Sequence, residues 1–280
     1  MVAPEVVTLL LKLLAALWLV ATAATTAAPT PAPTALPTPV LAPTPTDWSL
    51  NLYNSDGVRY QNPDGEACTA ATVETALNLA SLDGQQPPYW SPSTSYATEE
   101  ELFRYERAHM TMPSDVPGSD PHGVRNALNY FGWGSMVAGV YTDVAPSAFG
   151  AAAKAVVSSI ARTRKPAIVF VMAGGHTQLV TGYTVHGSNP ATSDSFTIVG
   201  IYLTDPLLGF LSLTGGNGVT QTFAAVHMNS WVSLRDWRYG PVAVRFSEYW
   251  QKDSWMRDPI DGKVGRNEWY GRFVAVIATR

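Results

Sequence analysis

The sequence contains only one cysteine, Cys68, in 280 residues. An internal disulfide is therefore excluded, because a disulfide needs two cysteines in one chain. Dense runs of lysine or arginine are also missing, and the net charge is −4. Nucleic-acid-binding proteins usually carry a basic surface, so we expect no nucleic-acid partner.

Patterns of metal ligands are missing as well. Residues 258–262, DPIDG, lack the alternating acidic ligands of a calcium loop and favour a turn. Four of the five histidines show neither an i, i+4 pair nor the carboxylate spacing typical of zinc sites: His109, His122, His186 and His227. We therefore predict no metal and no cofactor.

The N-terminal region has the composition of an export segment. Residues 6–24 are apolar apart from Lys12 and a few threonines, and residues 21–23, ATA, have the small-x-small form that signal peptidases recognise. The same stretch is just long enough to span a bilayer, so residues 1–24 are predicted to be a signal peptide or an uncleaved membrane anchor. Either alternative places the rest of the chain outside the cell or on its surface, in contact with the membrane only through this segment.

A proline, threonine and alanine tract follows at residues 25–46 and carries no charge. It predicts an extended polyproline-type linker that can reach roughly 60 Å at about 3.1 Å per residue. It acts either as a spacer or as a leader remnant without a spacing role. Residues 47–280 are predicted to form the globular domain, since 46% hydrophobic residues supply a sizeable core.

Cys68 lies in the first turn of a predicted helix. Residues 68–80 contain strong helix formers after a turn at residues 62–65, with an apolar stripe at Val73, Ala76, Leu77 and Ala80. Unpaired N–H groups at a helix N-terminus favour a thiolate, whereas the nearby Asp64 and Glu66 oppose it. The alternative role of Cys68 is that of a small buried hydrophobic residue. A lone thiol in an exported protein favours the reactive role.

The remaining patterns indicate helices in the first half and a mainly antiparallel sheet in the second, an α+β fold class. Residues 47–60 are predicted to be a short segment with a turn at 55–57. Further helices are predicted from residue 98, at 124–131 with Gly132 ending the helix, at 145–164 and at 221–235. Predicted strands cover residues 133–141, 167–172, 176–183, 196–203 and 272–279.

His176 and Asp205 are predicted to be neighbours. Two glycines precede His176 at the start of one predicted strand, where they leave room for the backbone of a substrate. Asp205 ends the next strand, and in an antiparallel hairpin the start of one strand lies beside the end of the next. Cys68, His176 and Asp205 would then supply a nucleophile, a general base and a group that orients the base. Gln61 would stabilise an oxyanion together with the backbone N–H of Cys68.

These residues also resemble a known family. Gln61 before Cys68 at a helix start, Gly-Gly-His opening a strand that runs to Thr-Gly-Tyr, and a strand ending in Asp-Pro are similar to papain-fold cysteine peptidases. The closest likeness is to family thirty-nine, the bacteriocin-processing peptidases, and covers roughly residues 58–210. The resemblance implies a papain-like fold in which Cys68 is the nucleophile, His176 the base, Asp205 the orienting acid and Gln61 the oxyanion residue.

Residues 211–280 form a tryptophan-rich C-terminal extension outside this resemblance. Its aromatic side chains either pack in the core or form a platform for sugar rings or an apolar peptide. They are Trp231, Trp237, Trp250, Trp255, Trp269, Tyr239, Tyr249 and Tyr270.

The sequence predicts an exported papain-like cysteine peptidase that hydrolyses peptide or amide bonds through an acyl-enzyme at Cys68. One alternative uses the same residues for cell-wall amide hydrolysis or acyl transfer. Another is a surface-displayed binding module on an inactive papain-like scaffold. The expected substrate is a peptide or a cell-wall amide, and the oligomeric state is not predicted.

Overall fold

The computed structural model describes residues 46–61, 67–112, 118–207, 210–214, 220–224, 228–250 and 268–280. The chain divides into two units, Met1–Pro43 and Thr44–Arg280, and all of the described residues lie in the second. The predicted signal or anchor and all but the last residue of the predicted linker lie outside the described residues, so both stay predictions. Within the ranges above, no helix is both long and apolar enough to cross a membrane.

A seven-stranded antiparallel sheet forms the centre of the second unit. Its order is β2-β9-β3-β4-β5-β8, and β1 also pairs with β4. The strands are β1 (Thr46–Asn51), β2 (Tyr141–Val144), β3 (Ala167–Val171), β4 (His176–Gly187), β5 (Phe196–Thr204), β8 (Ser230–Ser233) and β9 (Ala275–Ala278). A separate two-stranded sheet consists of β6 (Phe210–Thr214) and β7 (Thr220–Ala224).

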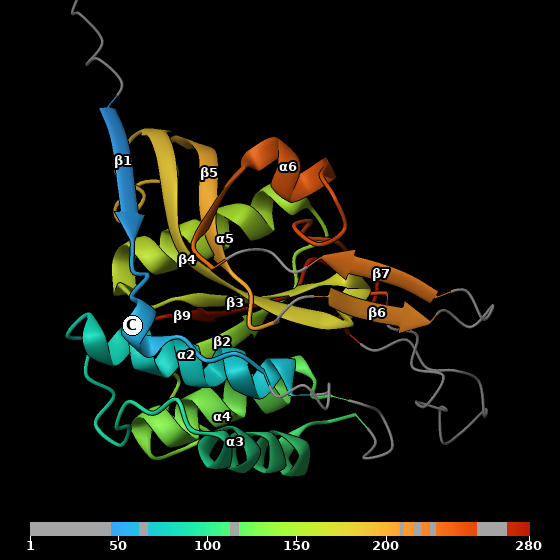
Figure 1. The fold of residues 1–280 in the computed structure, drawn as a ribbon. Helices are drawn as coiled ribbons and strands as arrows, with labels where there is room; N and C mark the ends of the chain where they lie inside the picture. Colours follow the sequence, from blue (N-terminus) through green and yellow to red (C-terminus); the bar gives the residue numbers. More distant parts are fainter. Residues whose placement is uncertain are drawn as a thin grey trace, which may run out of the picture. The chain divides into compact units, whose positions relative to one another are not determined.

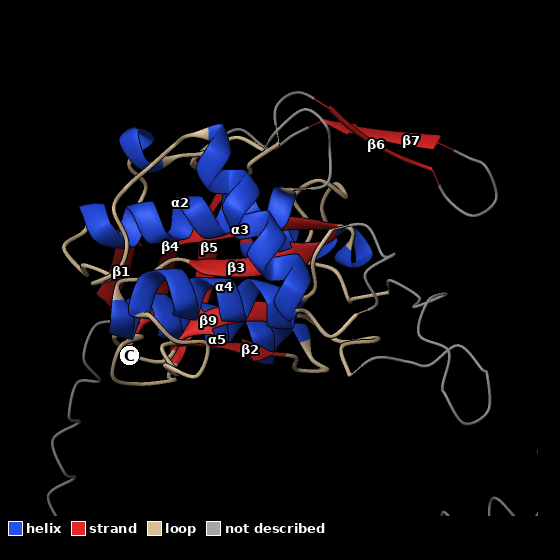
Figure 2. Cartoon of the chain, turned by 90° about the horizontal axis from the view of Figure 1, so that it is seen from below, coloured by secondary structure: helices blue, strands red, loops and turns tan. Residues whose placement is uncertain are grey.

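Helices cover both faces of the central sheet (Figure 1). On one face lie α2 (Cys68–Leu82), α3 (Tyr96–His109) and α4 (Pro121–Trp133), which Figure 2 shows in front of the strands. On the other face lie α5 (Phe149–Thr163) and the short α6 (Leu234–Tyr239). The protein is therefore a mixed α+β structure with an antiparallel sheet, as the α+β class predicts.

The sheet is buried on both faces, which explains the continuous apolar sequence of β3. Ile168 and Phe170 pack in the core beneath α2 and α4, whereas Val169 and Val171 pack in the core beneath α5. Successive side chains of a strand point to opposite faces, so a strand between two helical layers needs apolar residues at every position.

The helix that begins at Cys68 is confirmed, and several other predicted boundaries are corrected. Ser95 caps α3 by accepting a hydrogen bond from the Thr98 N–H at 3.2 Å, so this helix begins before residue 98. Gly132 lies inside α4, where a Cβ atom would come within 2.9 Å of Leu77. Gly134 ends α4 instead, with a φ of 76° that suits glycine.

Two predicted elements are wrong. The helix expected at 221–235 is replaced by the end of β7, by β8 and by α6, because residues 230–233 pair with β5 and Ser233 caps α6. Within the strand expected at 133–141, only Tyr141 belongs to a strand, as the first residue of β2. Its N–H donates to Asn129 Oδ1 at 2.8 Å. Residues 47–51 belong to β1 rather than to a segment outside the sheet.

The C-terminal extension contributes to the central sheet and core. Strand β9 is shorter than predicted and lies between β2 and β3. Trp237 and Trp269 are buried, whereas Trp231 is 49% and Trp250 47% exposed. The predicted aromatic platform is therefore divided between core and surface, and Trp255 lies outside the described residues.

Polar contacts hold the segment before α2 against the helices. The side chain of Asn78 donates to the Gly57 carbonyl at 3.0 Å. Arg59 forms an ion pair with Glu99 at 2.7 Å and lies 3.7 Å from Glu74. Burial raises the pKa of Glu74 to about 8, although Arg59 opposes the shift. These contacts fix the path of the chain that leads to Gln61.

Candidate active site

The N-terminal end of α2 presents a thiol. Cys68 is the first residue of the helix and is partly exposed, and Ala67 at the N-cap position supplies no side-chain acceptor. The backbone N–H groups of this first turn are thus left for another acceptor, such as an anion. Asp64 and Glu66, which are predicted to oppose thiol ionisation, lie outside the described residues.

The hairpin of β4 and β5 brings His176 and Asp205 together, as the sequence predicts. His176 begins β4, and Asp205 directly follows β5. The Nε2 atom of His176 is 2.8 Å from Asp205 Oδ1, and both side chains are almost fully buried. Asp205 thereby fixes the orientation of the imidazole ring and leaves Nδ1 as the ring nitrogen available to another group.

The thiol of Cys68 and the imidazole of His176 form a coupled pair. Burial alone would raise the pKa of Cys68, but the hydrogen bond and charge of His176 and the contacts with Thr177 outweigh it, so the pKa is lowered. Burial would lower the pKa of His176, but Asp205 and Cys68 raise it above its usual value. Both shifts favour a thiolate beside an imidazolium.

Thr177 is a contact of Cys68 that the sequence patterns do not reveal. Its hydroxyl and its backbone N–H both form hydrogen bonds with the thiol group and lower its pKa. The same hydroxyl lies 3.2 Å from the hydroxyl of Thr72, which donates to the Thr69 carbonyl at 2.7 Å. Thr72 and Thr177 therefore join the first turns of α2 to the start of β4.

Gln178 is a second contact outside the predicted set. Its amide donates to Asp205 Oδ2 at 2.7 Å and also to the Ala243 carbonyl at 2.7 Å. The Leu207 N–H donates to Asp205 Oδ1 at 2.9 Å. Besides its contact with His176, Asp205 therefore accepts hydrogen bonds from Gln178 and from Leu207, and these donors hold the carboxylate in place.

The turn before His176 has a strained backbone. Met172, Ala173 and Gly174 have φ values of 50°, 60° and 94°. Ser247 and Trp250 hold this turn through the Ala173 N–H and carbonyl, at 3.0 and 2.9 Å. A Cβ atom at Gly174 would lie 2.6 Å from the Tyr249 ring. Gly174 thus makes room for Tyr249, which corrects the expectation that both glycines leave space for a substrate.

Gln61 lies beside the residue that follows Asp205. Its backbone N–H donates to the Pro206 carbonyl at 2.8 Å, and its side chain is 6% exposed. The side-chain oxygen Oε1 is buried and has no hydrogen-bond partner among the described residues. The structure thus brings Gln61 to the Asp205 end of the site, while its predicted role at the oxyanion stays a prediction.

A buried carboxyl group, Glu106 of α3, lies beneath the thiol. Burial raises its pKa to about 8; the hydroxyls of Thr69 and Ser119 oppose this shift, and the charge of Cys68 adds to it. Neither carboxyl oxygen has a well-aligned hydrogen-bond partner in the described part of the chain. Glu106 is neutral at pH 7 and becomes a second negative charge near the thiolate above pH 8. No local pattern in α3 identifies it, because only packing brings α3 under Cys68.

The other histidines have separate contacts. His109 Nδ1 lies 2.8 Å from the Tyr105 carbonyl, and His186 Nδ1 lies 2.7 Å from Asp47 Oδ1. His122 lies near Asp143 and Glu268. His227 is outside the described residues. Across the part of the chain that the structure describes, no three His, Cys, Asp or Glu side chains are grouped closely enough to hold a metal ion.

Comparisons with known proteins gave no match: no family model, no curated protein and no solved structure is similar enough to this chain to indicate a family.

Substitution of Thr177 by valine tests the donors around the thiol. We expect Thr177→Val to raise the pKa of Cys68 by about one unit, because one hydrogen bond to a charged group is worth about 1.5 kcal/mol. The pH dependence of iodoacetamide alkylation measures this shift. Thr181→Val is the matched control, since Thr181 is equally buried in β4 and bonds to Tyr202 instead. Equal profiles for both variants would contradict the role of Thr177.

Glu106 should change the selectivity of Cys68 for charged reagents. Above pH 8 the ionised Glu106 repels the anion iodoacetate but not the neutral iodoacetamide. The alkylation rate with iodoacetate, divided by the rate with iodoacetamide, should therefore fall at least threefold as pH rises through 8. Glu106→Gln should remove this fall. Glu74→Gln is the control, because Glu74 is also buried with a pKa near 8 but lies beside Arg59. A fall that persists in Glu106→Gln would exclude Glu106 as its source.

Proposed function

We propose that this chain is an exported thiol hydrolase of the papain-like cysteine peptidase type, acting on peptide or amide bonds. The observation that carries the proposal is the chain of contacts from the Cys68 thiol to His176 and from His176 Nε2 to Asp205 Oδ1 at 2.8 Å. A partly exposed cysteine whose thiol pKa is lowered, held by a buried and oriented imidazole, is the arrangement that nucleophilic catalysis requires.

The proposed reaction starts from the thiolate and imidazolium pair. Cys68 Sγ attacks the carbonyl carbon of the substrate, and the electrons of the C=O bond move to the oxygen. The backbone N–H of Cys68 and the amide of Gln61 stabilise that oxyanion. When the C–N bond breaks, His176 gives its proton to the leaving amine, and a thioester remains on Cys68.

Water completes the cycle. Neutral His176 takes a proton from water, which attacks the thioester carbonyl. The C–S bond then breaks, the acid product leaves, and the thiolate and imidazolium pair is restored. Asp205 keeps the same ring nitrogen of His176 engaged throughout and stabilises the imidazolium.

Three features support the papain-like assignment. Helices α2, α3 and α4 precede all strands of the sheet except β1, the nucleophile candidate begins a helix, and the base candidate begins a strand of an antiparallel sheet. The apolar and proline-rich sequences before residue 47 support an extracellular or cell-surface location. A cell-wall amidase or acyltransferase would use the same residues. The second substrate separates hydrolysis from acyl transfer, since a hydrolase passes the acyl group to water and an acyltransferase passes it to an amine.

The pH dependence of iodoacetamide alkylation tests the proposal on the full chain. In the parent protein we expect the rate to reach its plateau near pH 5 to 6, because His176 stabilises the thiolate. In His176→Ala the profile should move toward a free-thiol pKa of about 8.5. Identical, slow, thiol-like profiles in both proteins would contradict the hydrolase and leave the binding scaffold as the better explanation.

A folding control accompanies that comparison. Asp205→Asn keeps an acceptor for His176 but removes the negative charge, so the profile should shift in the same direction by less. Circular dichroism of each variant shows whether the fold is kept.

For chemistry beyond alkylation, p-nitrophenyl acetate should acetylate Cys68, and added hydroxylamine should yield a hydroxamate if the acyl-enzyme accepts amines.

Gln61 is tested through the acylation step. We expect Gln61→Ala to slow acetylation of Cys68 by p-nitrophenyl acetate at least tenfold, since loss of one oxyanion donor costs about 10²–10³ in rate on better substrates. The alkylation profile should stay the same, because alkylation forms no oxyanion. Gln85→Ala, in the loop at the far end of α2, serves as the control. Acetylation at the parent rate would remove Gln61 from the mechanism.

A further inference from the structure

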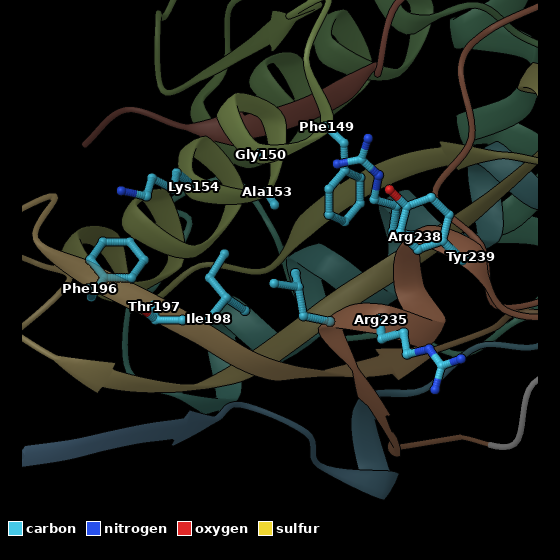
Figure 3. Close-up of a pocket in the computed structure, with 11 residues that line it drawn as sticks. Phe149, Gly150, Ala153, Lys154, Phe196, Thr197, Ile198, Arg235, Arg238 and Tyr239 are labelled. Carbon is cyan, nitrogen blue, oxygen red and sulfur yellow. The ribbon is translucent and has the colours of Figure 1, made fainter. Parts of the chain in front are cut away.

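A cavity of about 540 Å³ lies on the α5 face of the sheet, opposite to the face that carries α2 and Cys68 (Figure 3). It is formed by the start of α5, the start of β5 and α6. Its residues are Phe149, Gly150, Ala153, Lys154, Phe196, Thr197, Ile198, Leu234, Arg235, Arg238 and Tyr239. This volume lies within the range of pockets that bind small organic molecules.

The lining combines an apolar interior with positive charge. Aliphatic and aromatic side chains supply the walls, and three of the lining residues are basic: Lys154, Arg235 and Arg238. The described lining includes no acidic residue, although the whole chain has a net charge of −4. A neutral or cationic ligand would leave these charges unused, whereas an anionic ligand would pair with them.

Arg238 is held in place yet retains its donors. Its guanidinium lies 5.2 Å from the Phe149 ring centre and 4.8 Å from that of Tyr239. Contact with ring faces leaves the N–H groups at the edge of the guanidinium plane free to bind an anion. Within the described residues Arg238 has no carboxylate partner.

Lys154 lies at the other end of the cavity, as Figure 3 shows. Its ammonium lies 5.3 Å from the Phe196 ring centre and donates to the Asp194 carbonyl at 2.7 Å. That acceptor is a neutral carbonyl, so the charge of Lys154 is not neutralised by it. Arg235 is among the lining residues, but its guanidinium points away from the cavity in the same view.

We propose that this cavity binds a small amphipathic anion, with an aliphatic or aromatic body against Ala153, Ile198 and Leu234 and a carboxylate, phosphate or sulfonate group on Arg238. The shared chemistry is an anionic head on an apolar body. It is independent of the thiol site, so Cys68→Ala leaves the binding unchanged.

Two dyes that differ only in charge test the proposal on the full chain. Anilinonaphthalene sulfonate carries an anion, and phenylnaphthylamine has the same ring system without it; both fluoresce in apolar sites. We expect Arg238→Gln to weaken sulfonate binding about tenfold and phenylnaphthylamine binding less than twofold, since a charge-assisted hydrogen bond contributes about that factor. Arg235→Gln is the matched control and should change neither. Equal losses for both dyes, or none, would overturn the proposal.

A second variant fills the cavity without touching its charges. Gly150 lies on the exposed side of α5, and a Cβ atom there would have no atom within 4 Å. Gly150→Phe should remove binding of both dyes, while the adjacent and exposed Ala151→Phe should not. This pair keeps the proposal testable even if Arg238→Gln does not fold. Dye binding that survives in Gly150→Phe would place the dyes elsewhere and contradict the proposal.

Competition distinguishes a free anion from a membrane lipid. Displacement of the sulfonate dye by dodecanoate below its micelle concentration would identify a free amphipathic anion. Displacement by phosphatidylglycerol vesicles alone would identify a lipid head group as the source of the same chemistry. Dodecan-1-ol that competes as well as dodecanoate would show that the charge is not recognised and would overturn the proposal.

Discussion

The candidate site depends on the burial of His176 against Asp205. A buried imidazolium is costly unless a carboxylate stands beside it, and a buried carboxylate is costly unless donors surround it. The structure meets both requirements at the open end of the β4 and β5 hairpin, where Gln178 and the Leu207 N–H also donate to Asp205. The charge on His176 in turn lowers the pKa of Cys68. Loss of the hairpin register would therefore remove the thiolate as well.

The C-terminal region provides the support that this arrangement needs. Three consecutive residues before His176 have left-handed backbone conformations, and such a turn persists only when neighbouring structure holds it. Ser247 and Trp250 bind the turn, and the Tyr249 ring occupies the space that Gly174 leaves. Residues far from the thiol in sequence thus set the position of the imidazole. Part of the tryptophan-rich C-terminal extension therefore has a structural role close to the site.

The parts that the sequence predicts correctly depend on local patterns. The helix at Cys68 follows from helix formers after a turn, and the contact of His176 with Asp205 follows from the geometry of one hairpin. The parts that it misses depend on packing between distant elements. Thr177 and Glu106 reach Cys68 only because α2 is packed against β4 and α3. The helix predicted at 221–235 failed because pairing of β8 with β5 outweighs local helix propensity.

Three buried carboxyl groups in this structure differ in the hydrogen-bond donors around them. Asp205 has a histidine, an amide and a backbone N–H as partners. Glu74 and Glu106 are equally buried, but their oxygens have no well-aligned hydrogen bonds among the described residues, and burial raises both pKa values to about 8. At neutral pH the protein thus places a neutral carboxyl group, that of Glu106, beneath the thiol. Since the thiolate is disfavoured by a neighbouring negative charge, the protonated state of Glu106 is what makes its position under Cys68 compatible with a nucleophile.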